Sequence, residues 1–189
     1  VLSVLDELTS FCYPDFGLFG WRSERFFLSV RCGPIGQNGN GGHAHNDQLA
    51  VELNIDGEDW IADPGTGVYT ADPQVRDAYR SAGAHFVPAR DQGEPASLKL
   101  GLFRLQDRAK AECLVFSGMT FEGRHVGYGR PLHRRVVIGD GRIRITDGFA
   151  DTNGGKAPAA TIFSDGAALR NYLGLDLAFS PGYGLFDKP

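Results

Sequence analysis

Apolar and polar residues alternate in several short stretches of the chain, and this alternation predicts β-strands. Every second residue is apolar across 49–55, and an Asp-Gly pair at 56–57 then marks a β-hairpin turn. A second Asp-Gly pair at 140–141 divides residues 131–149 in the same way, so it predicts a second hairpin. Further strands are predicted at residues 25–33, 109–118, 159–165, 167–172 and 175–182.

Helical signals are few. Asp72 is suited to cap a helix and Pro73 to begin it, so one short helix is predicted near residues 73–81. Residues 1–10 suit a helical turn or a linker, and residues 150–158 suit a mobile loop. Short strands with recurring turns predict an all-β fold, an antiparallel two-sheet β-sandwich that forms one domain over residues 1–189.

Composition narrows the class of protein. With 189 residues and 42% hydrophobic content, the chain can bury a core of one domain. Its net charge of −4 disfavours bulk binding to nucleic acid or to an anionic membrane, and no apolar run has transmembrane length. Cys12, Cys32 and Cys113 form no CxxC motif, so either one disulfide or three thiols is compatible with the sequence.

Two histidines and an acid stand at alternate positions directly before the first hairpin, as His43, His45 and Asp47. In a strand such residues would point to one side, in phase with the apolar series that comes after them. Neutral imidazoles and a carboxylate are ordinary zinc ligands, and Asp63 or His85 could supply a further one. The alternative is that these are polar residues at strand ends, hydrogen-bonded or exposed to water.

The register of the first hairpin bears on a shared metal site. A two-residue loop would pair Ala50 with Asp63, on the face opposite His45. A three-residue loop with a left-handed glycine would pair Asp63 with Leu49 or Val51, on the face that His45 shares. Residue propensities do not choose between the two, but shared ligation would require the second.

Two well-known metal motifs compete for the stretch "HAHNDQ". The metallo-β-lactamase motif HxHxDH matches until Gln48 replaces its last histidine, and in that fold a helix comes next instead of a hairpin. Cupins place a glutamate a few residues after HxH, where this chain has Leu49 and Ala50, and Glu52 comes too late. Neither motif matches in full. An unrelated metallo-hydrolase nevertheless stays an alternative function.

A larger set of motifs points to one family. The stretch "GPIGQNGNGGHAHNDQLAVELNIDGEDWIADPGTGVYT", with "RDAYRSAGAHF" and "RDQGEP" after it, resembles the C-terminal domain of the heparinase II/III-like family. The resemblance is strongest from Phe16 to Pro95 and looser through residues 133–147. It implies a two-sheet β-sandwich beside an N-terminal helical toroid, in lyases that cleave uronic-acid polysaccharides by β-elimination. It also implies that this chain is a C-terminal fragment of a periplasmic or secreted protein.

The resemblance assigns roles by position. His45, Asp63 and His85 match zinc ligands, whereas His43 matches a histidine that reaches the cleft between the two domains. Phe86 stands where the family commonly has asparagine, which changes the local hydrogen bonding near His85. The toroid, which in this family supplies a tyrosine and a histidine for proton transfer, is not among these residues.

β-Elimination requires a base for the C5 proton of the uronate and a group that neutralises its carboxylate. His43 is the predicted catalytic residue, and the zinc site would serve a structural role. Arg80, five residues before His85, is the predicted contact to an acidic sugar. Arg76, Arg90, Tyr69 and Tyr79 are further candidates for contacts to sugar. The alternative within this fold is a non-catalytic, zinc-stabilised sandwich that binds glycans or supports its partner domain.

Overall fold

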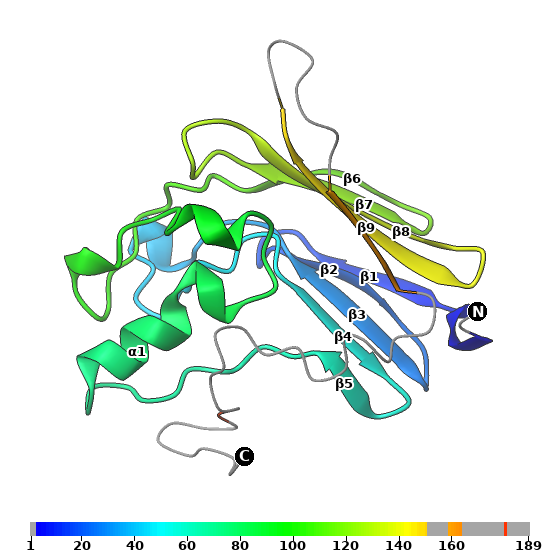
Figure 1. The fold of residues 1–189 in the computed structure, drawn as a ribbon, viewed down its shortest axis with the longest axis horizontal. Coiled ribbons are helices and arrows are strands. Elements are labelled where there is room, and N and C mark those ends of the chain that lie inside the picture. The colour runs from blue at the N-terminus through cyan, green and yellow to red at the C-terminus, as the bar shows by residue number, and fades with distance from the viewer. Residues whose placement is uncertain (1–2, 151–158, 164–179, 181–189) are drawn as a thin grey trace.

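Two antiparallel sheets pack face to face in the computed structural model, which describes residues 3–150, 159–163 and 180 (Figure 1). The predicted all-β sandwich is therefore confirmed. The first sheet has the order β1-β2-β3-β4-β5, with bounds Thr9–Tyr13, Leu18–Arg22, Phe26–Arg31, Val51–Ile55 and Glu58–Ile61. The second has the order β10-β9-β8-β7-β6, and in chain order β6 to β10 span Glu112–Ser117, Thr120–His125, Leu132–Gly139, Arg142–Phe149 and Ala159–Phe163.

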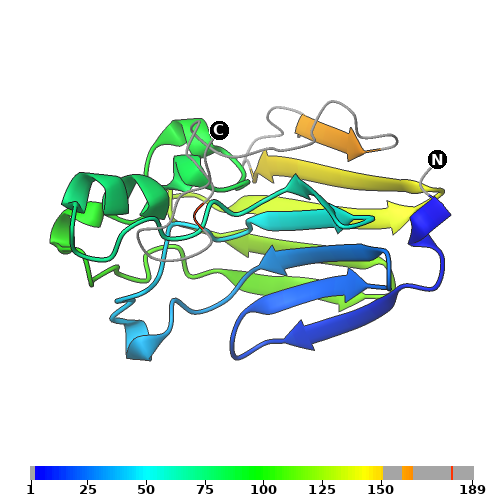
Figure 2. The same ribbon diagram turned by 90° about the horizontal axis from the view of Figure 1, so that it is seen from below.

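The chain completes one sheet before it begins the other. Residues 62–111 connect them and carry the helix α1, Pro73–Arg80, together with short 3₁₀ turns. Asp72 caps α1 by accepting hydrogen bonds from the backbone N–H groups of Gln74 and Val75, so the predicted helix and its cap are confirmed. Figures 1 and 2 show α1 and the connecting turns gathered at one end of the sandwich.

The space between the sheets holds one continuous apolar core. Residues of both sheets alternate between this core and the outside, most regularly in β7 and β8. The indole N–H of Trp21 in the first sheet donates to the carbonyl of Gly118 in the second, at 2.9 Å. Fully buried members of the core include Trp21, Leu28, Val30, Leu53, Phe121, Val136 and Ile143.

Three strands were not predicted, namely β1, β2 and β7. Glycines interrupt the apolar pattern of two of them, because a neighbouring group approaches the backbone too closely for a side chain. A Cβ on Gly20 of β2 would lie 2.7 Å from the ring of Phe11, and one on Gly123 of β7 would lie 3.0 Å from the sulfur of Cys32. Of the predicted strands, those at 167–172 and 175–182 lie outside the described residues, apart from Ser180.

The first hairpin combines the two predicted registers. Asp56 and Gly57 form a two-residue loop with φ of 55° and 80°, as a type I′ turn requires. The ladder then shifts, because Asn54 faces Asp59 whereas Leu53 faces Ile61, so Trp60 is the extra residue of a β-bulge. Continued along the chain, this shifted register carries Asp63 to the face that the three-residue loop would have given.

The histidine segment is not part of a strand. Strand β4 begins only at Val51, and Leu49 has φ of 65°, which breaks an extended backbone. The prediction that His43, His45 and Asp47 share the strand alternation is therefore wrong. They lie in an irregular loop, so their positions depend on the contacts of that loop and not on a two-residue period.

Two further features concern the chain as a whole. Within the described residues the three cysteines are free: Cys12 is exposed, Cys32 is buried and Cys113 is partly exposed. The described part of the chain also contains no helix with the length and apolar character that a membrane crossing requires.

Candidate functional site

The candidate site lies where three irregular segments meet at the α1 end of the sandwich. One is the loop before β4 with His43 and His45, the second comes after β5 with Asp63, and the third comes after α1 with His85. His85 and Asp63 are in direct contact: the His85 Nδ1 and an Asp63 carboxylate oxygen are 2.6 Å apart. The His45 and His85 ring centroids are 5.3 Å apart. The structure thus brings together all three residues predicted as metal ligands.

The ionisation of this cluster follows from its burial. Burial lowers the pKa of His45, and the neighbouring His85 lowers it further, so the His45 imidazole is neutral near pH 7. Burial alone would raise the pKa of Asp63, but the hydrogen bond with His85 outweighs it and the net shift is downward. The same bond raises the pKa of His85 against its own burial. Asp63 is therefore a carboxylate.

These residues have the donor types of a zinc site. The Nε2 atom of His85 is buried and has no hydrogen-bond partner in the described structure, which is unusual for a buried polar atom. No group of three such side chains in the described ranges is arranged to hold a metal ion. Tetrahedral ligands at 2.0–2.2 Å are about 3.4 Å apart, so His85 and Asp63 would have to separate from their direct contact to bind one ion.

Asn46 and Glu94 join the histidine loop to the segment after α1. The backbone N–H of Asn46 donates to the Arg80 carbonyl at 2.9 Å, and its side-chain amide donates to Glu94 at 2.5 Å. Glu94 in turn accepts from the backbone N–H of Ala82. Because Asn46 comes directly after His45 and Ala82 precedes His85, this network fixes the spacing of the two histidines. The sequence interpretation gave neither residue a role, although both lie within the motifs of the family resemblance.

Arg134 of β8 holds the same two segments from the second sheet. One of its nitrogens donates to the carbonyls of Leu49 and Phe86 at 2.7 and 2.5 Å. Its other nitrogens form two hydrogen bonds with Asp147 of β9, both at 2.7 Å. The Phe86 ring packs against the guanidinium, so the residue that replaces the family's asparagine still has a defined environment. The signal in the sequence that could have revealed this role is an arginine at an inward-facing position of a predicted strand.

Arg80, the predicted contact to substrate, is fully buried. Its guanidinium donates to Asp77 and to the carbonyls of Gly101, Arg104 and Ala44. Because these bonds lie within the chain, the burial of Arg80 argues against the predicted sugar contact and supports a structural role.

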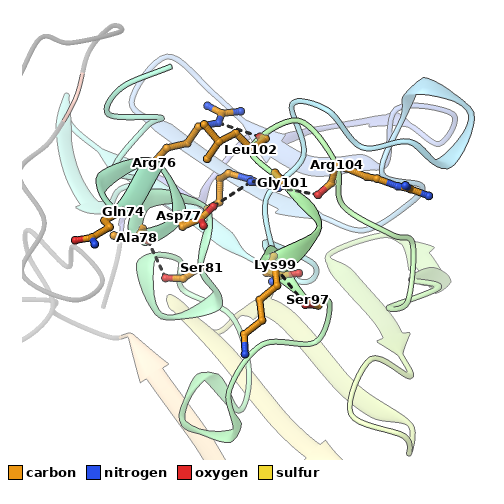
Figure 3. Close-up of polar contacts among 12 residues, drawn as sticks. Gln74, Arg76, Asp77, Ala78, Ser81, Ser97, Lys99, Gly101, Leu102 and Arg104 are labelled. Carbon is orange, nitrogen blue, oxygen red and sulfur yellow. Dashed lines mark hydrogen bonds and ion pairs between the residues drawn. The ribbon is translucent and has the colours of Figure 1, made fainter. Parts of the chain in front are cut away.

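Arg76 and Tyr79 are buried in the same region. Arg76 reaches the Leu102 carbonyl at 3.1 Å (Figure 3) and lies against the rings of Tyr69 and Phe103. Tyr79 is 3% exposed. Neither side chain is therefore available to a sugar, whereas Arg90 is exposed in a 3₁₀ turn.

His43 has a different environment from His45. Its side chain is exposed, as predicted, and its Nε2 lies 3.4 Å from the hydroxyl of Tyr69. It lines a cleft of about 380 Å³ together with Phe16, Arg31 and Asp47. An imidazole, a guanidinium and a carboxylate thus face one open space, next to a phenol. Such a set can bind an anionic ligand and exchange protons with it.

Comparison with known proteins agrees with this architecture. The family model described as "Heparinase II/III-like, C-terminal" matches residues 7–175. Among solved structures, a heparinase III with methylated lysines is similar with a TM-score of 0.57, and a heparan sulfate lyase from Pedobacter heparinus with a TM-score of 0.55. In both cases the identity is 19%, and the match covers 75% of this chain and 22% of the other. No curated protein matches the sequence significantly.

The match to the family model covers most of the chain and includes all three segments of the candidate site. The two solved structures share the fold, and the chain spans about a fifth of the length of each. The chain belongs to the heparinase II/III-like family and carries its C-terminal domain.

Proposed function

We propose that the full-length protein is a polysaccharide lyase that cleaves uronic-acid glycans by β-elimination, and that this chain is its metal-bearing sandwich. The observation that carries the proposal is that two neighbouring histidines, His43 and His45, have different environments and are assigned different roles. His43 is exposed in a cleft, whereas the partly buried His45 turns to Asp63 and the buried His85. Membership of the heparinase II/III-like family argues against an unrelated metallo-hydrolase.

The chemistry assigns a role to the cleft. A base removes the C5 proton of the uronate, and the electron pair of that bond forms the C4–C5 double bond. The bond from C4 to the leaving oxygen breaks, and the oxygen keeps its electron pair and takes up a proton from a general acid. The C5 proton is weakly acidic, so the uronate carboxylate must be neutralised or polarised. We assign His43 to that carboxylate or to assisting the base, with Arg31 on the cleft wall as a further cation. An N-terminal helical toroid of the same protein would provide the opposite wall and further proton-transfer groups.

This cluster is proposed to hold zinc through His45, Asp63 and His85. The donor types support this, as do the neutral His45, the ionised Asp63 and the Nε2 of His85, which has no hydrogen-bond partner among the described residues. When bound, the ion would cross-link the loop before β4, the segment after β5 and the segment after α1. That cross-link would fix the direction of His43, and no step of the reaction requires the metal to touch the substrate.

The same proposal covers partners and location. The substrate would be an acidic polysaccharide, and heparan sulfate and polyuronates are the first polymers to test, since the two similar structures are a heparinase and a heparan sulfate lyase. A lyase for such polymers would act in the periplasm or outside the cell.

The test compares two histidine variants of the full-length protein, with absorbance of the conjugated double bond as the readout of elimination. His43→Ala should lower turnover strongly while zinc content and melting temperature stay nearly unchanged. His45→Ala should lose zinc and stability first, and activity as a consequence. If His43→Ala removes the metal, or if it retains the wild-type rate, the division between the two histidines is wrong.

Two controls complete the test. Chelation with verified metal loss should lower the melting temperature of the wild-type protein, because coordination links separated segments. The isolated chain should show little or no elimination, since groups that act as one catalytic unit fail together. Robust cleavage of a uronate polymer by these residues alone would overturn the requirement for the toroid.

A further inference from the structure

The outer face of the second sheet carries a group of arginines that the proposed reaction does not use. In the β8–β9 hairpin Val137 pairs with Arg144, and Gly139 with Arg142. Arg135 lies two residues before Val137 on the same face, so its side chain extends beside that of Arg144. Arg135, Arg142 and Arg144 are all exposed. Three like charges therefore lie on neighbouring outward positions of two paired strands.

These three guanidinium groups have no ion-pair or hydrogen-bond partner within residues 3–150 and 159–163. Other basic residues on this face do have ion-pair partners: Arg124 pairs with Glu112, and His133 lies 3.8 Å from Glu122. Glu122 also faces Arg135 across the β7–β8 ladder, but the two form no ion pair in the described structure. Arg135 and Arg144 are diagonal neighbours on paired strands, within reach of each other's long side chains, so their like charges repel. The chain has 23 acidic residues against 19 lysines and arginines. The fold thus leaves this charge to be neutralised from outside.

The arginines line a trough. A cavity of about 370 Å³ is lined by the three arginines, with Val137 and Thr146 among the residues between them. A second cavity of about 410 Å³ adjoins it, since Arg135 and Thr146 line both. From Arg142 to Phe149 the trough follows the strand for roughly 20–25 Å. The two acids that line it, Asp140 and Glu122, lie in the turn and in β7, respectively.

We propose that this trough, the surface of β8 and β9 lined by Arg135, Arg142 and Arg144, binds a stretch of acidic polysaccharide outside the His43 cleft. Guanidinium groups form paired hydrogen bonds with planar or tetrahedral oxyanions, so carboxylate and sulfate groups along one chain would each find a partner. The trough length admits several sugar units. Of the residues that the structure describes, none lines both the trough and the His43 cleft. The substrate class rests on the proposed function, whereas the anionic character rests on the arginines alone.

A nucleic acid is the competing polyanion. The chain as a whole is acidic, with a net charge of −4, and nucleic-acid binders usually carry an extended basic surface. The described trough residues include two aromatic rings, those of Phe149 and His133 at one end, instead of the series that stacks on successive bases. These observations favour a polysaccharide.

The test measures binding of heparan sulfate and of a polyuronate to the chain by titration calorimetry at several salt concentrations. The triple variant Arg135→Gln, Arg142→Gln, Arg144→Gln should bind at least about tenfold more weakly, and its salt slope should fall by roughly one for each lost contact. Arg124→Gln is the matched control, because this arginine lies on the same face and is paired within the fold; it should bind like the wild type. Unchanged affinity in the triple variant, or equal affinity of the wild type for a nucleic acid, would overturn the proposal.

A second arm separates the trough from the reaction. In the full-length protein, the triple variant should raise the KM for long polymers several-fold and leave turnover of a short oligosaccharide unchanged. His43→Ala should lower turnover of both and leave polymer binding at the trough intact. An absence of elimination by the wild-type protein would contradict the proposed function but not the binding result. Equal effects of the triple variant on long and short substrates would contradict the trough.

Discussion

The two hairpins begin with the same turn and end in different geometries. Both use an Asp-Gly pair with positive φ, at 55° and 80° for Asp56 and Gly57 and at 52° and 65° for Asp140 and Gly141. The β8–β9 ladder then continues through eight pairs without a shift, whereas β4–β5 shifts after two pairs. A turn therefore fixes register only for the first pairs, and packing decides the register of the remaining ones.

The difference determines where each hairpin can contribute to function. In β8–β9 the unbroken alternation sends Arg134 inward to the site segments and Arg135 outward to the trough. In β4–β5 the bulge at Trp60 shifts the register and carries Asp63 to His85. The regular hairpin thus presents two faces in a fixed pattern, and the bulged one redirects a single acid. Substitutions in both hairpins, and a change of pH, can test this contrast.

The largest effect is expected for the inward arginine of the regular hairpin. Arg134→Met should lower the free energy of unfolding by about 3–5 kcal/mol, because it leaves Asp147 without its partner, the buried Leu49 carbonyl without a donor, and the Phe86 carbonyl with only the Val51 N–H. Denaturant unfolding is the measurement. Arg135→Gln, one residue along and facing outward, should change it by less than about 0.5 kcal/mol. Similar losses in both variants would contradict the assignment of the two faces.

A smaller loss is expected for the acid beyond the bulge. Asp63→Ala should cost about 2–3 kcal/mol in the presence of a chelator, because the buried His85 loses its acceptor. The control is Asp59→Ala, which lies before the bulge and bonds to the Asn54 amide at the surface. It should cost no more than about 0.5 kcal/mol. If urea unfolding shows the same loss of stability for both variants, the bulge does not serve to place Asp63 in a stabilising contact with His85.

A pH effect is expected at the strand that flanks the regular hairpin. Burial lowers the pKa of His125 to about 4, and the Gly127 N–H donates to its Nδ1, so the folded state favours the neutral ring. The unfolded chain, with a pKa near 6.5, binds more protons between these values. Stability should therefore be full above about pH 6.5 and should fall by roughly 1–3 kcal/mol towards pH 4.

His125→Asn is the variant that isolates this effect. Its amide oxygen can accept the same backbone hydrogen bond but does not titrate. The loss of stability between pH 7 and pH 5, measured by thermal unfolding, should be smaller in the variant than in the wild type. An identical pH dependence would show that other groups account for the acid sensitivity.

The smallest effect is expected at the two turns. Gly57→Ala and Gly141→Ala should each cost about 1–2 kcal/mol, because a side chain disfavours the left-handed conformation. At Gly57 the added Cβ would meet no atom within 4 Å, so the cost there is conformational alone. The losses in free energy of unfolding of the two variants, measured side by side, should agree within about 0.5 kcal/mol. A much larger loss at Gly57 would mean that the bulge depends on the turn.

Local chemistry made several features predictable. Asp-Gly pairs, the Asp72 cap with Pro73, and alternation in β3, β4, β8 and β9 act over a few residues, so they can be read without the fold. The ligand set of His45, Asp63 and His85 was predicted from the residue types and the family motifs, and the structure brings the three residues together. Their metal stays a prediction.

Other features depended on contacts between distant segments. Alternation suggested that His43 and His45 face one side, yet the left-handed Leu49 ends the period, and loop contacts direct one ring outward and the other inward. In the sequence Arg80 cannot be distinguished from an exposed arginine, and only the carbonyls that surround it in the structure show that it is buried.

The fold class, the two turns, the helix and the residue types of the site could all be predicted from the chain alone, because periodicity and short-range backbone preferences specify them. The bulge at Trp60, the Arg134 contacts and the trough arginines, which have no partner in the described part of the chain, emerged only in the folded molecule. Each of these depends on which groups remain unsatisfied after two sheets have packed. That is a property of surfaces far apart in the chain, so no local pattern encodes it.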